Sequence, residues 1–199
     1  QERGAFSLEE LQCLFKNRPG EWGDDLGYMV FYIAASTGMR SGEVRALSWE
    51  QIDLAAGTIN IDRAFKSQHE IGLPKWDKTR KIPVSSGVLS ILAEVKDLSA
   101  DDGLLFKTSA GPIGPTFWKK RFDNALEESK IDPSGRNLSP HSLRHTLNSV
   151  LLQTGIDNWL VQHYLGWTSR SGLSPVQTGY THIGTDNLQK VSRKIGRLL

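Results

Sequence analysis

The chain has 199 residues, 38% of them hydrophobic and 23% charged, which excludes a disordered or fibrous protein. Its formal net charge of +2 is only mildly basic, so total charge alone does not predict a nucleic-acid partner. The longest apolar run, Leu26 to Ala35, is too short to span a membrane, residues 1–4 lack a secretory signal pattern, and the single Cys13 excludes an internal disulfide.

Helical patterns fill the first quarter of the chain. Ser7 is a typical N-cap, and the apolar spacing after it predicts a helix that Pro19-Gly20 ends. A second helix is predicted from Asp24 or Asp25 to Thr37. It is apolar on most sides, which indicates a core helix, and Gly38 supplies a left-handed stop. Ser41 then caps a short third helix.

A small antiparallel sheet is predicted next. Alternating apolar residues at Ile52 and Leu54, and again at Ile59 and Ile61, flank a turn and predict a hairpin. A third strand fits Lys81 to Val84, and Pro83 places it at an edge of the sheet. The intervening stretch, from about Phe65 to Arg80, is expected to be an exposed loop or turn.

Helical periodicity returns in the second half of the chain. The predicted helices cover about Ser86 to Leu98, Thr116 to Ser129, Pro140 to Thr154, Asp157 to Leu165 and Asp186 to Ile195. Residues 132–135 and 169–175 are predicted loops. We therefore predict a single α+β domain over residues 1–199, mostly helical, with one small three-stranded antiparallel sheet.

Two segments in the first half contain candidate functional cations. Arg40 follows a glycine turn between two helices, where its guanidinium is held in place and Glu43, one turn away, can orient it. Taken alone, the pair can equally be a surface ion pair. Lys75 lies on a cationic turn that leads into a strand, where a lysine can donate a proton to a departing oxygen. A basic turn that serves only solubility is the alternative.

Two segments in the second half add further candidates. In Ser139-Pro140-His141-Ser142-Leu143-Arg144-His145, a cap and a proline begin a helix. His141 and Arg144 then share the face of its first turn, where both side chains and the helix dipole can converge on an anion. Trp167 and Tyr180 follow in Gly- and Thr-rich settings. Tyr180 is poorly explained as a core residue, whereas Tyr28, Tyr32 and Tyr164 are assigned to packing.

The order Arg, Lys, His-x-x-Arg, Leu-Gly-Trp, Tyr resembles the catalytic domain of the tyrosine recombinases, the phage integrase type, from about Ser7 to Ile195. The resemblance implies an integrase-like fold and assigns phosphate binding to Arg40 and Arg144. It makes Lys75 the lysine of the strand turn, pairs His141 with Arg144, and makes Tyr180 the nucleophile.

Two departures from the family pattern affect this assignment. Trp167 stands where a second histidine is usual; its indole N–H can donate a hydrogen bond but cannot exchange a proton. The interval from Trp167 to Tyr180 is a few residues longer than usual, with residues 169–174 as the expected insertion. The position of Tyr180 is therefore less firmly set than that of Arg40 or Arg144.

Clustered cations indicate where a DNA backbone could lie, although a solvated face is the usual explanation of any one cluster. Arg45 and Arg136 also lie near turns or helix starts. The predicted DNA-binding residues are Lys78, Arg80 and Lys81 in one cluster and Lys119, Lys120 and Arg121 in another.

The resemblance implies that the protein cleaves and rejoins double-stranded DNA at a specific site through a 3′-phosphotyrosine, without metal, ATP or another cofactor. The lack of a secretory signal pattern predicts a cytoplasmic, nucleoid-associated protein. The resemblance implies a missing N-terminal DNA-binding domain, so that the chain alone is a monomeric fragment. Residues 187–199 either dock into a neighbouring subunit of a homo-tetramer or pack on the chain's own core. A type IB topoisomerase and a catalytically silent DNA-binding relative are the alternative functions.

Overall fold

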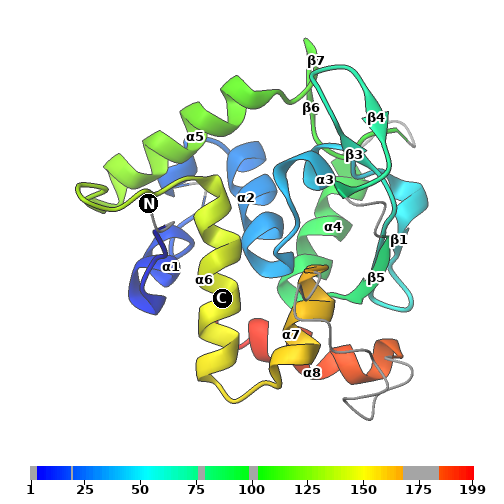
Figure 1. Ribbon diagram of the computed structural model, residues 1–199. Coiled ribbons are helices and arrows are strands. Elements are labelled where there is room, and N and C mark those ends of the chain that lie inside the picture. Colours follow the sequence, from blue (N-terminus) through cyan, green and yellow to red (C-terminus); the bar gives the residue numbers. More distant parts are fainter. Residues whose placement is uncertain (1–3, 19, 76–78, 99–102, 168–183) are drawn as a thin grey trace.

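The computed structural model describes residues 4–18, 20–75, 79–98, 103–167 and 184–199. Helices dominate it, and a small sheet lies at one side (Figure 1). The α-helices are α1 Leu8–Leu14, α2 Asp25–Thr37, α3 Ser41–Arg45, α4 Ser86–Leu98, α5 Pro115–Glu128, α6 Pro140–Gln153, α7 Asn158–Leu165 and α8 Thr185–Ile195. Short 3-10 helices, η1 Gly20–Trp22 and η2 Trp49–Gln51, precede α2 and the sheet.

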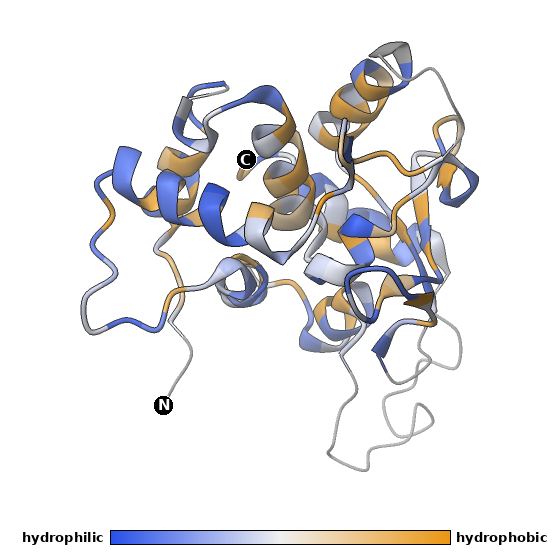
Figure 2. Cartoon of the chain, turned by 90° about the horizontal axis from the view of Figure 1, so that it is seen from above, coloured by the Kyte–Doolittle hydropathy of each residue, from blue (hydrophilic) through white to orange (hydrophobic). Residues whose placement is uncertain are grey.

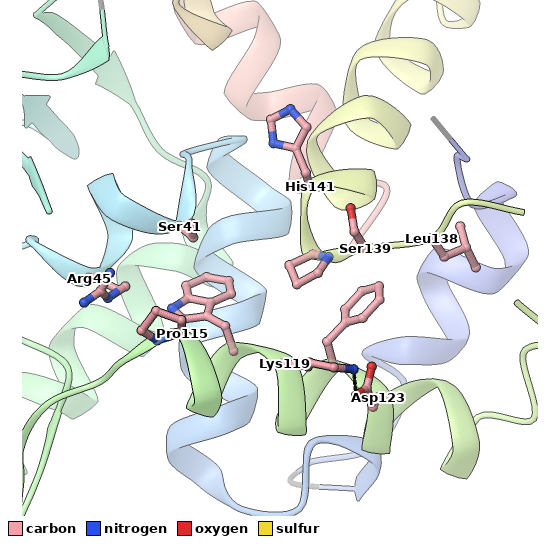
Figure 3. A pocket seen from close by; sticks show the side chains of 11 residues that line it. Ser41, Arg45, Pro115, Lys119, Asp123, Leu138, Ser139 and His141 are labelled. Carbon is pink, nitrogen blue, oxygen red and sulfur yellow. Dashed lines mark hydrogen bonds and ion pairs between the residues drawn. The ribbon is translucent and has the colours of Figure 1, made fainter. Parts of the chain in front are cut away.

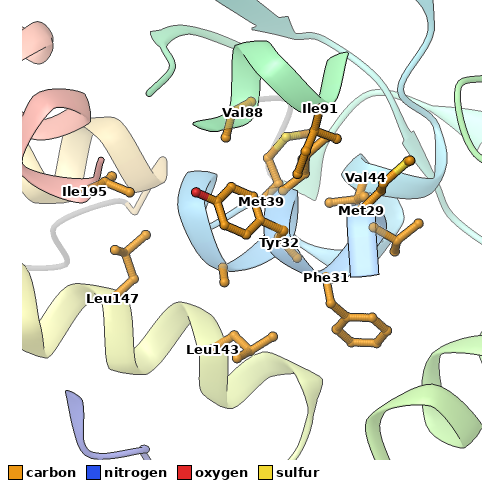
Figure 4. Packing of buried hydrophobic residues seen from close by; sticks show 14 of the residues in the cluster. Met29, Phe31, Tyr32, Met39, Val44, Val88, Ile91, Leu143, Leu147 and Ile195 are labelled. Carbon is orange, nitrogen blue, oxygen red and sulfur yellow. The ribbon is translucent and has the colours of Figure 1, made fainter. Parts of the chain in front are cut away.

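Helix α2 lies at the centre of the molecule and packs against α3, α4, α6 and α8. Val30, Phe31 and Ile33 are fully buried on it, as the lack of a polar face predicts. Figure 4 shows side chains of α4, α6 and α8 converging on this helix. The hydropathy colouring in Figure 2 shows orange segments toward the interior and blue segments on the outer helices. The predicted core helix is confirmed.

The predicted three-stranded antiparallel sheet is also confirmed, in the order β1 (Ile52–Asp53), β2 (Thr58–Ile61) and β5 (Arg80–Pro83). Ile59 lies opposite Ile52 on one side and Ile82 on the other. Strand β5 lies at an edge, as Pro83 requires, because proline has no N–H to donate to a further strand.

The prediction that residues 65–80 form only a loop is wrong in part. Strands β3 (Ala64–Phe65) and β4 (Ile71–Gly72) form a short antiparallel pair, closed by the hydrogen bond that the N–H of Lys66 donates to the carbonyl of Glu70. A second unpredicted pair joins β6 (Lys107–Thr108) to β7 (Gly111–Pro112). Strands of two residues are too short to show a periodic pattern.

The C-terminal helix α8 packs on the chain's own core. Its apolar stripe of Leu188, Val191 and Ile195 is buried, and the helix contacts β5, α7, α2 and α6. Of the two predicted alternatives, packing within the chain is the one observed in this single chain. None of the helices in the described ranges is long and apolar enough to cross a membrane.

Candidate active site

Arg40 lies at the junction of α2 and α3. Gly38 ends α2 in the left-handed conformation, with φ 61°, and Arg40 is the N-cap of α3. The carboxylate of Glu43 accepts two hydrogen bonds from Arg40, from the backbone N–H at 2.9 Å and from Nη1 at 2.8 Å. Glu43 thereby fixes both ends of the arginine, and the Arg40 side chain, 23% exposed, remains accessible from solvent.

Arg80 approaches the same carboxylate from strand β5. Its Nη1 and Nη2 donate to the two Glu43 oxygens at 3.2 and 2.8 Å, and its Nε donates to the carbonyl of Tyr164 at 3.2 Å. Burial alone raises the pKa of Glu43, but the guanidinium groups of Arg80 and Arg40 outweigh it and lower that pKa to about 2. Glu43 is therefore ionised and fully buried between two arginines.

Arg144 completes the cluster from helix α6. It is buried, and it donates to two backbone carbonyls, from Nη1 to Gly38 and from Nη2 to Leu165. Two of its five N–H groups are used in this way, and its Nε has no acceptor among the described residues. Burial lowers the pKa of Arg144, and the nearby charges of Arg40 and Arg80 lower it further.

The aromatic side of the site consists of Trp167 and two histidines. The Trp167 ring centroid lies 5.2 Å from Cζ of Arg144. It lies 5.7 Å from the ring centroid of His145. The His145 ring centroid in turn lies 4.8 Å from that of His141. His141 and Arg144 line one small cavity, of about 40 Å³, together with Met39 and Ser41. His145 lies one helical turn after His141 on α6, and its ring lies between those of His141 and Trp167. The sequence analysis did not select this residue.

The charges of this cluster do not balance. Three guanidinium groups, from Arg40, Arg80 and Arg144, face a single carboxylate, that of Glu43, within the described part of the chain. A buried positive charge is costly unless an anion compensates it. The arrangement can therefore hold an anion, and guanidinium groups match the geometry of phosphate.

Two of the predicted DNA-binding cations form ion pairs within the domain. Arg80 is buried in the ion pair with Glu43, because period-two alternation turns it inward with Ile82 while Lys81 points outward. Arg121 forms an ion pair with Asp24, the N-cap of α2, and so joins α5 to α2. Arg80 is therefore not a surface cation, whereas Arg121, whose side chain is 24% exposed, stays a predicted DNA contact.

The remaining cations are exposed or lie outside the described residues. Lys81 and Lys120 are exposed, and Lys119 is exposed with an ion pair to Asp123 one turn along α5. Lys75 is exposed on the connection between β4 and β5. It lies five residues before Arg80, so its Cα is at most about 17 Å from that of Arg80.

Lys78 and Tyr180 lie outside the described residues. Arg136, another cation near a turn, forms an ion pair with Glu10 and so holds the N-terminal segment against the domain. Within the described ranges, no group of three His, Cys, Asp or Glu side chains is placed to hold a metal ion.

Gly38 makes a testable contribution to this site. A Cβ at this position would meet Leu165 and Leu147, and φ 61° disfavours any residue with a side chain. We expect Gly38→Ala to lower the free energy of unfolding by about 2–3 kcal/mol, from conformational strain plus overpacking. Urea unfolding measures this.

The matched control for Gly38→Ala is Gly135→Ala. Gly135 has φ 70° but nothing lies within 4 Å of its added Cβ, so only the conformational cost of about 1 kcal/mol should appear. Equal losses in the two variants would contradict the packing argument.

A sequence model of the phage integrase family matches residues 17–184. The chain belongs to the phage integrase family. Its relatives include tyrosine recombinase XerC of Pseudomonas fluorescens, 33% identical over 167 residues that cover 81% of this chain and 49% of that protein. XerC of Halalkalibacterium halodurans is 26% identical over 166 residues, which cover 82% of this chain and 52% of that protein. The chain thus spans about half the length of these relatives.

Solved structures of integrases share the fold. The Tn1549 transposon integrase, in complex with a circular intermediate DNA, superposes with a TM-score of 0.72 at 18% identity, covering 100% of this chain and 67% of that one. The XerA recombinase gives a TM-score of 0.66 at 24% identity, and the match covers 94% of this chain and 61% of that one. The predicted fold class, a helix-rich integrase-like catalytic domain with a small antiparallel sheet, is confirmed.

Proposed function

We propose that this chain is the catalytic domain of a site-specific DNA recombinase, which cuts and rejoins double-stranded DNA through a covalent 3′-phosphotyrosine. The observation that carries the proposal is the surplus of guanidinium groups at Arg40, Arg80 and Arg144 around the single carboxylate of Glu43. One DNA phosphodiester brings one of the two missing negative charges. Membership of the phage integrase family supports the same substrate.

In the proposed reaction, Arg40 and Arg144 hold the non-bridging oxygens of the scissile phosphate. Their hydrogen bonds strengthen as charge accumulates in the five-coordinate transition state, which lowers its energy relative to the bound substrate. Trp167 donates its indole N–H to the phosphate. Glu43 and Arg80 do not touch the substrate; they position Arg40.

The phenol oxygen of Tyr180 attacks phosphorus, and its proton passes to His141. The bond from phosphorus to the 5′ oxygen breaks, and Lys75 protonates that oxygen. The products are a 3′-phosphotyrosine and a free 5′ hydroxyl. A 5′ hydroxyl of a partner strand then attacks the phosphotyrosine in the reverse sequence, which restores the phosphodiester and the free tyrosine.

Strand exchange requires two DNA sites, and we include in the proposal four copies of the protein acting on them. One of the solved fold neighbours is a lambda integrase tetramer bound to a Holliday junction. In the single chain the apolar stripe of α8 is buried against its own core.

The experiment uses the full-length protein and a pool of duplexes that carry a nick within a randomised sequence. A strand cut near the nick releases a short fragment, which diffuses away and leaves the covalent complex trapped. We expect an adduct that survives denaturing electrophoresis, forms in the presence of EDTA, and maps to the peptide containing Tyr180 by mass spectrometry. An adduct on Tyr28, Tyr32 or Tyr164 would overturn the assignment.

The same protein distinguishes a recombinase from a topoisomerase. The duplexes recovered from the adducts supply the target sequence, and two such duplexes of different length should then yield recombinant products. Relaxation of supercoiled DNA without any exchanged product would assign the topoisomerase function instead. If no duplex forms an adduct, the protein is instead a catalytically silent DNA-binding relative.

A further inference from the structure

A second cavity adjoins the candidate active site. It has a volume of about 430 Å³ and lies between α3, α5 and the start of α6 (Figure 3). Ser41, the residue after Arg40, lines it, and so does His141, which also lines the small cavity beside Arg144. The two cavities therefore share part of their walls.

Arg45 brings a buried positive charge to this cavity. It is only 6% exposed, its Nε donates to the carbonyl of Ile113 at 2.7 Å, and its Cζ lies 4.5 Å from the ring centroid of Phe65. Its Nη2 has no acceptor, and no carboxylate forms an ion pair with it, among the residues that the structure describes. Burial lowers the pKa of Arg45.

Trp118 adds a second buried donor to the same wall. It is 5% exposed, and its indole Nε1 has no acceptor within the described ranges. Indole N–H is a donor only, so it needs an acceptor and cannot supply one. Lys119 lies beside it on α5, and the carboxylate on this wall, that of Asp123, is bound to Lys119.

Buried donors without acceptors are rare in folded proteins. The Arg45 Nη2 and Trp118 Nε1 atoms are themselves covered, but both side chains line one cavity, and an unpaired guanidinium in its wall favours a ligand that brings acceptor oxygens. Because one of the two is a charged guanidinium, the ligand that fits is an anion. Phosphates of one DNA strand succeed one another every 3.4 Å or so along the helix axis. A phosphate next to one held at Arg144 is thus within reach of a cavity that shares His141.

We propose that the cavity lined by Arg45, Trp118 and Lys119 binds a second phosphodiester of the DNA strand, within about two nucleotides of the scissile phosphate. This inference rests on the proposed function. A second phosphate held in a fixed pocket defines where along the strand the scissile bond lies, so the pocket sets the register of cleavage.

The test combines protein variants with duplexes in which single phosphates are replaced by neutral methylphosphonates. In the wild-type full-length protein, neutralising the bound phosphate should lower DNA affinity about tenfold, as expected for a charged hydrogen bond. In Arg45→Met the same methylphosphonate should cause almost no further loss of DNA affinity. The slope of log affinity against log salt should also fall by about 0.9. Lys190→Met, on the exposed face of α8, is the control and should retain the tenfold loss.

Two further variants cover the case in which Arg45→Met does not fold. Trp118→Phe keeps an aromatic ring and removes the indole N–H. Arg45→Lys keeps the positive charge but loses the several N–H donors of the guanidinium. In both variants the same methylphosphonate should lower DNA affinity less than in the wild type. If every methylphosphonate costs these variants as much as the wild type, while covalent adducts still form, the pocket proposal fails and the proposed function stands. Loss of adducts with every duplex in the wild type would instead refute the proposed function.

A free anion is the alternative source of the same chemistry. Millimolar inorganic phosphate would then raise the melting temperature of the wild type but not of Arg45→Met, and no methylphosphonate position would depend on Arg45. That pair of results would overturn the assignment to DNA.

Discussion

Tyr180→Phe is expected to abolish the covalent protein–DNA adduct while DNA binding is largely retained. The substitution removes one oxygen, which is the atom that forms the bond to phosphorus, and leaves the ring in place. Adduct formation is measured by denaturing electrophoresis with the nicked duplex. Binding is measured by mobility shift at the same salt concentration, because phosphate contacts depend steeply on salt.

The other three tyrosines pack within the described part of the chain, which supports the proposed role of Tyr180. Tyr164 is fully buried, and its hydroxyl donates to the carbonyl of Pro83 at 3.1 Å. Tyr32 is buried and Tyr28 stacks on it, with ring centroids 5.8 Å apart. Tyr28 also lies nine residues before the end of α2 at Thr37, which is about 14 Å along the helix axis from the turn that leads to Arg40.

Tyr28→Phe is the control for this experiment, because Tyr28 is the partly exposed member of the packed tyrosines. It should form adduct at the wild-type rate. An undiminished adduct in Tyr180→Phe would refute the assignment of the nucleophile.

Glu43→Gln is expected to lower the free energy of unfolding by about 3–5 kcal/mol, the cost of removing one partner of a buried ion pair. Glu43 is fully buried and its carboxylate accepts hydrogen bonds from both Arg40 and Arg80. Its replacement leaves Arg80 buried without a counter-charge. Urea unfolding at neutral pH measures the loss.

The pH dependence of the wild type gives a second measure of the same interaction. The pKa of Glu43 is lowered from 4.5 to about 2, so the stabilisation from its ionised form is fully present above about pH 5. That stabilisation is lost as the pH falls from about 4.5 toward 2, and it amounts to about 3 kcal/mol. The stability difference between wild type and Glu43→Gln should therefore shrink across this acid window.

Glu94→Gln is the matched control for Glu43→Gln. Glu94 also binds an arginine, Arg18, with two oxygens, but both side chains are partly exposed. An exposed pair of this kind contributes about 1 kcal/mol or less. If Glu43→Gln and Glu94→Gln lower the free energy of unfolding by similar amounts, the buried ion pair of Glu43 does not have the stabilising role proposed here. Adding Arg80→Met to Glu43→Gln should restore part of the stability, because it removes the uncompensated charge.

Most helices could be predicted from the sequence because their signals are local. Ser7 and Asp24 accept hydrogen bonds from backbone N–H groups in the first turns of α1 and α2, as N-cap residues do. Gly38 and Gly166 end α2 and α7 in the left-handed conformation. The three-stranded sheet followed from the alternation at Ile59 and Ile61, both fully buried.

The parts that escaped prediction depend on contacts between distant segments. Arg80 lies in a run of cations and resembles its neighbours, yet its partner Glu43 is 37 residues away. Arg121 likewise follows two exposed lysines but pairs with Asp24, 97 residues away. Such long-range ion pairs leave no local pattern, although strand alternation at Arg80 already indicates an inward side chain.

The carbonyl groups at the end of α7 link the arginine cluster to the segment that contains Tyr180, the proposed nucleophile. Arg80 binds the carbonyl of Tyr164 and Arg144 binds that of Leu165, while α8, beyond the 16 residues 168–183, packs on β5. Both anchors of the intervening segment are thus built into the domain. Lengthening a chain between two fixed anchors costs only about 0.6 kcal/mol per doubling. The spacing before Tyr180 can therefore grow at little cost in free energy, provided that the two anchors keep their positions.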